Sequence, residues 1–328
     1  MRATAIGSMP LVDGSFAEAT SIVVGELPEF PHVVELPHKG PGADMCGRTG
    51  ALLSVISSDL SWETTTTGWR HATGQGVAMR RGLSMWSESL DALEERLEGY
   101  QGQVKTQLVG PWTFVASMES SNGNRALHDA GFVDDITDAL VEAVRQHIRD
   151  MHRRIPKADL WVQIDEPAIT SVLNGSVPTA SGLHRLSAID PQRASRLLNA
   201  VVSAIHQESA RAAIHSCAAQ LPWSLLLSTP FDAISFDVSL HQRADHEYLG
   251  QLIDMGRQAW LGVVPTTATA DPVAVGWRTM DQLRRDIGFS EDEWSEHVAV
   301  TPACGLGDAD VTWTRRALAA TREILWQA

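Results

Sequence analysis

The stretch DPQRASRLLNAVVSAIHQESARAAIHSC, residues 190–217, contains a helix pattern followed at once by a strand pattern. Its first part, residues 190–209, opens with Asp and Pro, which favour a helix start, and then repeats apolar residues at helical spacing. These residues are Leu197, Leu198, Val201, Val202 and Ile205. The second part, AAIH at 212–215, is a short apolar run typical of a buried strand. The stretch therefore predicts one helix–strand unit of an α/β fold.

The same alternation recurs along the whole chain. Further helix patterns cover residues 87–100, 134–151 and 311–328. The eight short β-prone runs are Thr4–Ser8, His32–Leu36, Lys105–Val109, Leu160–Ile164, Ala212–His215, Ala233–Asp237, Ala259–Val264 and His297–Val300. Such alternation predicts a parallel sheet, and eight units suit an α/β fold of the (β/α)8 TIM barrel type, with a doubly wound open sheet as the alternative. We expect one domain over residues 1–328, with 46–82 as an insertion over the barrel mouth that is able to form a hairpin.

Composition narrows the class of protein. The 328 residues are 44% hydrophobic, which is enough for a large core, and carry a formal net charge of −14. This acidic balance argues against a nucleic-acid partner. No apolar run reaches the length of a membrane span, and the first residues lack the core of a signal peptide, so we expect a cytoplasmic protein without membrane attachment. Three cysteines far apart in sequence favour reduced thiols over a disulfide framework.

A histidine and two cysteines follow predicted strands. His215 and Cys217 are two positions apart, so their side chains share one face at the end of a strand. Alone, this pair is more often a buried His beside a buried Cys than a metal site. Cys304, in TPACGLG at 301–307, follows the last predicted strand, and strand ends meet at the mouth of a barrel. Three such ligands with an open position form the pattern of a catalytic zinc. Asp237 ends another strand and could be a fourth ligand or equally a cap.

Two further strand ends carry candidate substrate-binding groups. IDEPA, residues 164–168, places Asp165 and Glu166 at a strand exit, where acids are costly unless they are used. Either could hold a substrate ammonium, and a salt bridge or helix cap is the alternative. In AIGS, residues 5–8, glycine permits close approach to the backbone, and free N–H groups with the Ser8 hydroxyl could bind a carboxylate.

Taken in order, AIGSMP, GPWT, QIDEPA, HSC, ISFDVS and TPACGLG resemble motifs of the C-terminal catalytic barrel of cobalamin-independent methionine synthase. That barrel belongs to a superfamily shared with uroporphyrinogen decarboxylase. The resemblance extends from residue 4 to about residue 308. It implies one Zn²⁺ held by His215, Cys217 and Cys304, which takes up the thiol of homocysteine. Where the family has a glutamate as fourth ligand, this chain has the shorter Asp237.

The resemblance also implies the groups that hold the amino-acid end of homocysteine. These are Ile6, Gly7 and Ser8 together with Asp165, to which we assign the catalytic role of orienting the substrate. Glu35 is the best match to a further family glutamate, although the surrounding ELPHKGPGADM does not align cleanly.

Two departures from the family bear on the methyl donor. The chain has no room for a second, N-terminal barrel that helps to bind folate, so it is similar to the single-barrel core form. In GVVPTTAT, residues 262–269, Thr266 or Thr267 stands where the family has a proton-transferring histidine. This weakens methyl-folate as donor and allows a methylated corrinoid protein. The expected function is zinc-dependent methyl transfer to homocysteine. The alternatives are alkyl transfer to another thiol, such as coenzyme M, and a structural zinc barrel without turnover.

Overall fold

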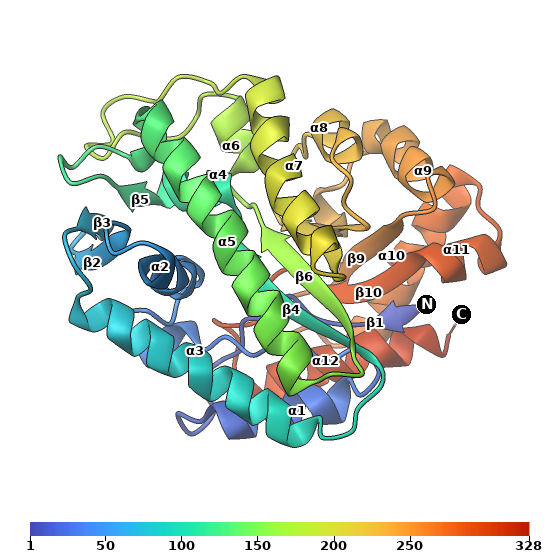
Figure 1. Ribbon diagram of the computed structural model, residues 1–328. Helices are drawn as coiled ribbons and strands as arrows, with labels where there is room; N and C mark the ends of the chain where they lie inside the picture. Colours follow the sequence, from blue (N-terminus) through green and yellow to red (C-terminus); the bar gives the residue numbers. More distant parts are fainter. Residues whose placement is uncertain (328) are drawn as a thin grey trace.

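A seven-stranded parallel sheet forms the centre of the molecule. The computed structural model describes residues 1–327, and Figure 1 shows helices packed around this sheet. The strand order is β1-β10-β9-β8-β7-β6-β4, with every neighbouring pair parallel. The strands are β1 (Arg2–Ala3), β4 (Gln103–Val109), β6 (Asp159–Asp165), β7 (Arg211–Ser216), β8 (Ala233–Asp237), β9 (Gln258–Val264) and β10 (Val298–Pro302). The parallel α/β class predicted from the sequence is therefore confirmed, with seven regular strands in place of eight.

The sheet curls so that one segment contacts the edge strand β4 on one side and the residues that follow the edge strand β1 on the other. Residues 31–36 form an isolated parallel bridge to β4, between His32 and Lys105, and another between Glu35 and Ser8, beyond the end of β1. The predicted strand at 32–36 is thus not a regular strand, and neither is the predicted strand at 4–8, because the regular strand β1 ends just before it at Ala3. The other six predicted strands overlap β4 and β6 to β10.

Side chains explain why these two segments are irregular. The Val33 carbonyl accepts hydrogen bonds from His32 Nδ1 at 2.9 Å and from Gln107 Nε2 at 2.9 Å. The Ile6 carbonyl accepts from two side chains in the same way, as described below. A carbonyl that is satisfied by side chains cannot also sustain a regular strand ladder. The polar groups inside the sheet thus interrupt the strands that they support.

Helices cover the outer face of the sheet. Their bounds are α1 (Phe16–Glu26), α2 (Met45–Ile56), α3 (Val77–Arg96), α4 (Pro111–Ser117), α5 (Ala130–Arg154), α6 (Ile169–Leu173), α7 (Pro191–Gln207), α8 (Trp223–Ser228), α9 (His246–Asp254), α10 (Pro272–Ile287), α11 (Glu291–His297) and α12 (Val311–Leu325). Asp190 caps α7 by accepting from the N–H groups of Gln192 and Arg193, both at 3.0 Å. The predicted helix at 311–328 begins as expected, and its last residue, Ala328, lies outside the described residues. β1, at the start of the chain, lies beside β10 and α12 (Figure 1).

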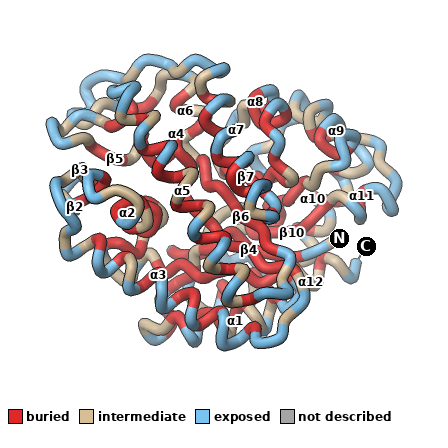
Figure 2. The backbone as a smooth tube through the Cα atoms, viewed as in Figure 1, coloured by how far each residue is buried: buried red, intermediate tan, exposed pale blue. Residues whose placement is uncertain are grey.

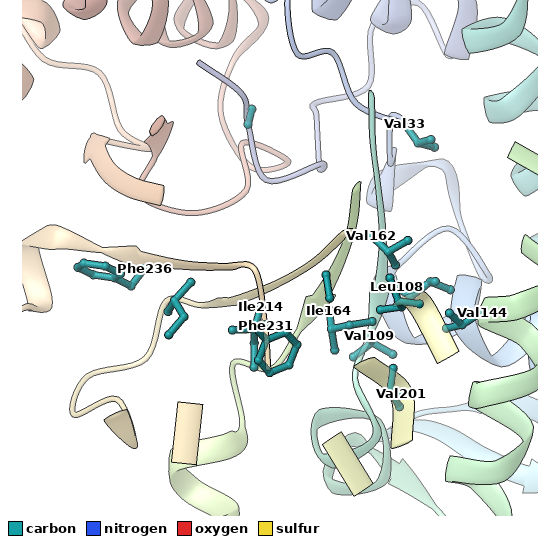
Figure 3. Close-up of a cluster of buried hydrophobic side chains, with 14 of the residues drawn as sticks. Val33, Leu108, Val109, Val144, Val162, Ile164, Val201, Ile214, Phe231 and Phe236 are labelled. Atoms are coloured by element: carbon teal, nitrogen blue, oxygen red, sulfur yellow. The ribbon is translucent and has the colours of Figure 1, made fainter. Parts of the chain in front are cut away.

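Two separate apolar clusters stabilise the fold, one on each face of the curled sheet. Figure 2 shows the buried backbone concentrated in the strands and in the inner faces of the helices. The outer cluster joins sheet and helices, and Figure 3 shows part of it, with Leu108 of β4 near Val162 of β6 and Val144 of α5. The inner cluster contains Phe30, Trp161, Ala213, Ala233, Trp260 and Ala299, which we call the apolar plug. Most plug residues sit near the amino ends of their strands, so the other end of the interior is left for polar side chains.

The segment at 46–82 forms a helix and a hairpin. The strands β2 (Ser61–Thr65) and β3 (Gly68–Ala72) pair antiparallel, and β5 (Met118–Glu119) adds to β3 in parallel. Trp62 of the hairpin is fully buried, with its ring 5.2 Å from that of Phe114. The hairpin therefore has an apolar anchor of its own on the main body.

Candidate functional site

Three side chains meet at the carboxyl ends of β7 and β10. His215 is the next-to-last residue of β7, Cys217 follows that strand by one residue, and Cys304 follows β10 by two residues. One ring nitrogen and the two Sγ atoms all lie within 4.8 Å of one another. Zinc binds such atoms at about 2.0 to 2.3 Å, so the three can share one ion after small side-chain adjustments. The sequence-predicted trio is thus brought together in space.

The state of these atoms fits a metal centre. His215 is buried, and its Nδ1 is 3.0 Å from the Ser235 hydroxyl, whereas its Nε2 has no hydrogen-bond partner. A buried ring nitrogen without a partner is costly unless it binds something else. The two Sγ atoms lie 2.9 Å apart, and their shared hydrogen bond lowers the pKa of Cys304 to about 4 while it raises the pKa of Cys217. Two neighbouring sulfur atoms and an imidazole nitrogen without a hydrogen-bond partner form a donor set that suits Zn²⁺.

These ligands open into a cavity of about 330 Å³. The other lining residues come from the start of the chain, from 35–45 and from the ends of β6 and β10. They are Ile6, Ser8, Glu35, Pro37, His38, Asp44, Met45, Asp165, Pro167, Gly305, Gly307 and Asp308. No Lys or Arg is among the described lining residues, whereas four of them are acidic. The cavity therefore presents a negative wall beside the candidate metal centre.

Asp165 and Glu35 are the buried acids of this wall. Asp165 ends β6 and accepts a hydrogen bond from Gln163 Nε2 at 2.7 Å. Burial raises the pKa of Asp165 to about 7, and the nearby His215 opposes that shift. Glu35 lies 3.5 Å from Arg48 Nε, an ion pair that is almost fully buried. Both carboxyl groups face a space large enough for a small molecule.

Glu166 does not line the cavity, and its role in substrate binding stays a prediction. Its carboxylate accepts from Trp112 N at 2.9 Å and from the Thr113 N–H and hydroxyl, both at 2.7 Å. Glu166 thus satisfies the free N–H groups at the start of α4. This is the helix-cap alternative stated above for the two acids of IDEPA. Burial raises the pKa of Glu166 to about 7.

Gly7 and Asp237 also lie outside the lining. Gly7 has a φ of 141°, and an added Cβ would lie 2.6 Å from the Gln107 side chain, so only glycine fits beside this strand. Asp237 accepts from Ser239 N at 2.8 Å as the cap of a short 3-10 turn, Val238–Leu240. It does not belong to the group formed by the His and the two Cys. Its assignment as a fourth ligand stays a prediction.

Several cavity residues were missed from the sequence. His38 Nε2 lies 2.8 Å from Asp308 Oδ1 at the rim, and Asp44 accepts from Trp69 Nε1 of the hairpin at 3.2 Å. All but Trp69 line the cavity. For His38 and Asp44 the sequence signal was the polar run ELPHKGPGADM, which begins at the end of a predicted strand and so falls at the mouth, whereas Asp308 directly follows TPACGLG. Thr266 and Thr267 lie in the loop after β9 and do not line the cavity.

The curled parallel sheet, its covering helices and this cavity define the chain as an α/β protein with a candidate metal centre at its strand ends. Residues 94–325 match the family described as the catalytic domain of cobalamin-independent synthase. The chain therefore belongs to this family, which confirms the resemblance inferred from the motifs. Membership makes the chain an enzyme of the methionine synthase type, which is a class of methyltransferase.

Solved structures support the fold. A B12-independent methionine synthase from Shewanella sp. W3-18-1, in complex with selenomethionine, aligns with a TM-score of 0.64 and 11% identity, over 99% of this chain and 98% of that one. Dispersin B aligns over 100% of this chain and 99% of its own, with a TM-score of only 0.47 and 6% identity. No curated protein sequence matches the chain. Among the described residues, no helix is long and apolar enough to span a membrane.

Proposed function

We propose that the chain is a zinc-dependent methyltransferase that moves a methyl group to the thiol of homocysteine and forms methionine. The observation that carries this proposal is the meeting of His215, Cys217 and Cys304 in one cavity with buried carboxyl groups. Family membership supports the reaction class. We further propose that residues 31–36 serve as the irregular eighth strand of a (β/α)8 barrel, because they form bridges on both sides.

The proposed ligands are His215 Nε2 and the two Sγ atoms. A bound Zn²⁺ would keep a substrate thiol deprotonated, and hence nucleophilic, at neutral pH. Three protein ligands leave one coordination position for that thiol, which favours a catalytic centre over a closed structural one. Ser235 orients the imidazole by its contact with Nδ1, so that Nε2 is the nitrogen left to bind.

The remaining lining residues suit the amino-acid end of homocysteine. Asp165 and Glu35 can accept hydrogen bonds from the substrate ammonium, since both are buried acids that line the cavity. The segment at 6–8 approaches the same cavity with the Ser8 side chain and with backbone that no regular strand occupies. Holding both ends of the substrate aligns its thiol for in-line attack on a methyl carbon.

A thiol with a sulfonate tail, such as coenzyme M, fits the cavity less well. A sulfonate requires cationic partners. The described lining residues include no Lys or Arg, and the acidic ones among them would repel the sulfonate. The charge of the wall therefore favours an amino-acid thiol.

The methyl donor is proposed to be methyl-folate or a methylated corrinoid protein. The loop after β9 carries Thr266 and Thr267 at the place expected for a proton-donating histidine. A folate amine needs a proton as it leaves, whereas a cobalt leaving group does not, so this loop favours the corrinoid donor.

The test is a methyl-transfer assay with homocysteine, in which methyl-folate and methylcobalamin are compared and zinc content is measured in parallel. We expect methionine to form only in the metal-loaded protein, and faster with methylcobalamin. Turnover with coenzyme M but not with homocysteine would replace the proposed substrate. A full complement of zinc without turnover on either thiol would favour the structural role.

A further inference from the structure

Three buried side chains lie directly beneath the cavity and do not line it. They are Lys105 and Gln107 of β4 and Gln163 of β6, and we call them the polar floor. Lys105 and Gln107 are two residues apart and so share a face, and Gln163 is paired with Gln107 in the sheet. All three are at most 1% exposed. Neither the metal centre nor the chemistry at the thiol needs them there.

The polar floor contacts the backbone of the first segment. Lys105 Nζ donates to the Ile6 carbonyl at 2.9 Å, and Gln163 Nε2 donates to the same oxygen at 3.0 Å. A carbonyl with two such donors is fixed in direction, and the peptide groups that follow it are fixed with it. The floor thus sets the orientation of residues 6–8 against the cavity.

The same side chains hold the two buried acids. Gln163 Nε2 donates to Asp165 Oδ1 at 2.7 Å, and Gln107 Nε2 donates to Glu35 Oε1 at 3.1 Å. Lys105 Nζ in turn contacts Gln107 Oε1 at 3.5 Å. Both buried acids proposed to bind the substrate ammonium are therefore hydrogen-bonded to the floor, as is the Ile6 carbonyl.

The buried charge of Lys105 lies near two opposite charges, those of Asp165 and Glu35. A fully buried ammonium is stable only where acceptors and opposite charges compensate for its lost hydration. Burial lowers the pKa of Lys105 to about 7, and the attraction of Asp165 and Glu35 on the cavity side opposes that shift. The Ile6 carbonyl accepts a hydrogen bond from Nζ and compensates for part of the lost hydration. Conversely, a cation below the two acids reduces their mutual repulsion without occupying the space that a ligand needs.

We propose that Lys105 is a positioning residue that selects a thiol carrying an α-amino-acid group over a bare thiol. It acts through Ile6, Asp165 and Glu35, with Gln107 and Gln163 as the connecting groups. The inference deepens the proposed function and rests on it for the identity of the thiol. Its direct consequence is that loss of Lys105 weakens binding of the amino-acid end and leaves metal and thiol affinity in place.

The experiment is calorimetric titration of the zinc-loaded full chain with L-homocysteine and with 1-propanethiol, without any methyl donor. The wild type should bind homocysteine at least about tenfold more tightly than propanethiol, because the amino-acid end makes charge-assisted hydrogen bonds. Lys105→Met should weaken homocysteine binding by at least about tenfold and change propanethiol binding by less than about threefold. Lys157→Met, at an exposed lysine in a surface turn, is the matched control and should change neither.

A wild type without preference for homocysteine, or a Lys105→Met protein that loses both ligands equally, overturns the inference. If Lys105→Met does not fold, Gln163→Met tests the inference instead, because it removes the hydrogen bonds to Ile6 and Asp165 but keeps every charged side chain. That variant should lose about fivefold or more in homocysteine affinity alone, and equal affinity would again overturn the inference. Preference for homocysteine without methyl transfer would remove the proposed function and leave the inference standing.

Discussion

The two ends of the sheet interior are built from the same strands and contain opposite chemistry. At one end Phe30, Trp161 and Trp260 pack with ring centroids 5.1 to 6.0 Å apart, and three alanines of neighbouring strands fill the remaining space. At the other end, the polar end, those strands present Asp165, His215 and Cys304 to a cavity. On β6, only three residues lie between Trp161 and Asp165. A change at either end can therefore leave the other in place.

The energetic cost of the two ends differs as well. Large rings among small residues interdigitate at high density, and such packing stabilises the fold. The polar end contains buried atoms without hydrogen-bond partners, among them His215 Nε2, Gln163 Oε1 and Thr301 Oγ1. Each such atom lowers the free energy of unfolding. The apolar plug stabilises the folded state, and this stability offsets the cost of the buried polar atoms without partners at the polar end.

The largest effect should come from Cys304→Ser at the polar end. Removing one of three ligands should lower metal affinity, and with it methyl transfer, by about 1,000-fold or more. Zinc content after dialysis and methionine formation are the measurements. Cys46→Ser is the matched control, since Cys46 is buried in α2 and belongs neither to the metal group nor to the cavity lining. Equal zinc content in the two variants would contradict the site.

Trp260→Ala tests the plug. Loss of a fully buried ring should reduce the free energy of unfolding by about 3 to 5 kcal/mol, measured by denaturant titration. Zinc affinity of the folded variant should stay within about threefold, because the ligands lie at the opposite strand ends. The control is Trp326→Ala, whose side chain is 71% exposed and should cost little. A parallel loss of metal would show that the two ends are coupled and would break the comparison.

Glu166→Gln tests whether Glu166, next to Asp165 at the polar end, contributes to stability in a pH-dependent way. The pKa of Glu166 is raised from its ordinary value of 4.5 to about 7 by burial, so the folded state holds this proton more tightly than the unfolded chain. The resulting stability is fully present below pH 4.5 and is lost as pH rises through 7. The advantage of the wild type over Glu166→Gln should therefore shrink by about 2 kcal/mol between pH 5 and pH 8. Unfolding titrations at both pH values measure it, and a constant difference would contradict this role of the proton.

The sequence predicted the ends of the strands better than their beginnings. Parallel strands end at one edge, so a polar residue at a strand exit can be placed beside others without knowing the loops. This logic brought His215, Cys217 and Cys304 together, and it placed Asp165 correctly at the cavity. It could not separate Asp165 from Glu166, because adjacent residues at a strand exit point in different directions and only the packing of α4 decides which one faces the cavity.

The polar floor was missed, although its signal was present. In the predicted strand KTQLV, lysine and glutamine alternate with Thr106 and Leu108, which face the outer side of the sheet, and this alternation indicates a polar inner face. The short apolar runs at 4–8 and 32–36 gave no indication that side chains would donate hydrogen bonds to their backbone carbonyls. Regular strand structure there depended on contacts about 100 residues away, such as that from Lys105 to Ile6. Local patterns contain no information about such contacts.

Replacing Asp237 should have the smallest effect on stability, and it tests whether the metal centre extends beyond the His and the two Cys. As a cap of residues 238–240, its replacement in Asp237→Ala should cost about 1 kcal/mol of stability and leave zinc affinity within about threefold. Dialysis against a chelator of known affinity, followed by metal analysis, measures the second quantity. A loss of zinc approaching that of Cys304→Ser would restore Asp237 as a fourth ligand, with its carboxylate turning from the Ser239 N–H to the metal. Asp237→Asn separates the two roles further, because an amide still caps the turn but is a poor zinc ligand.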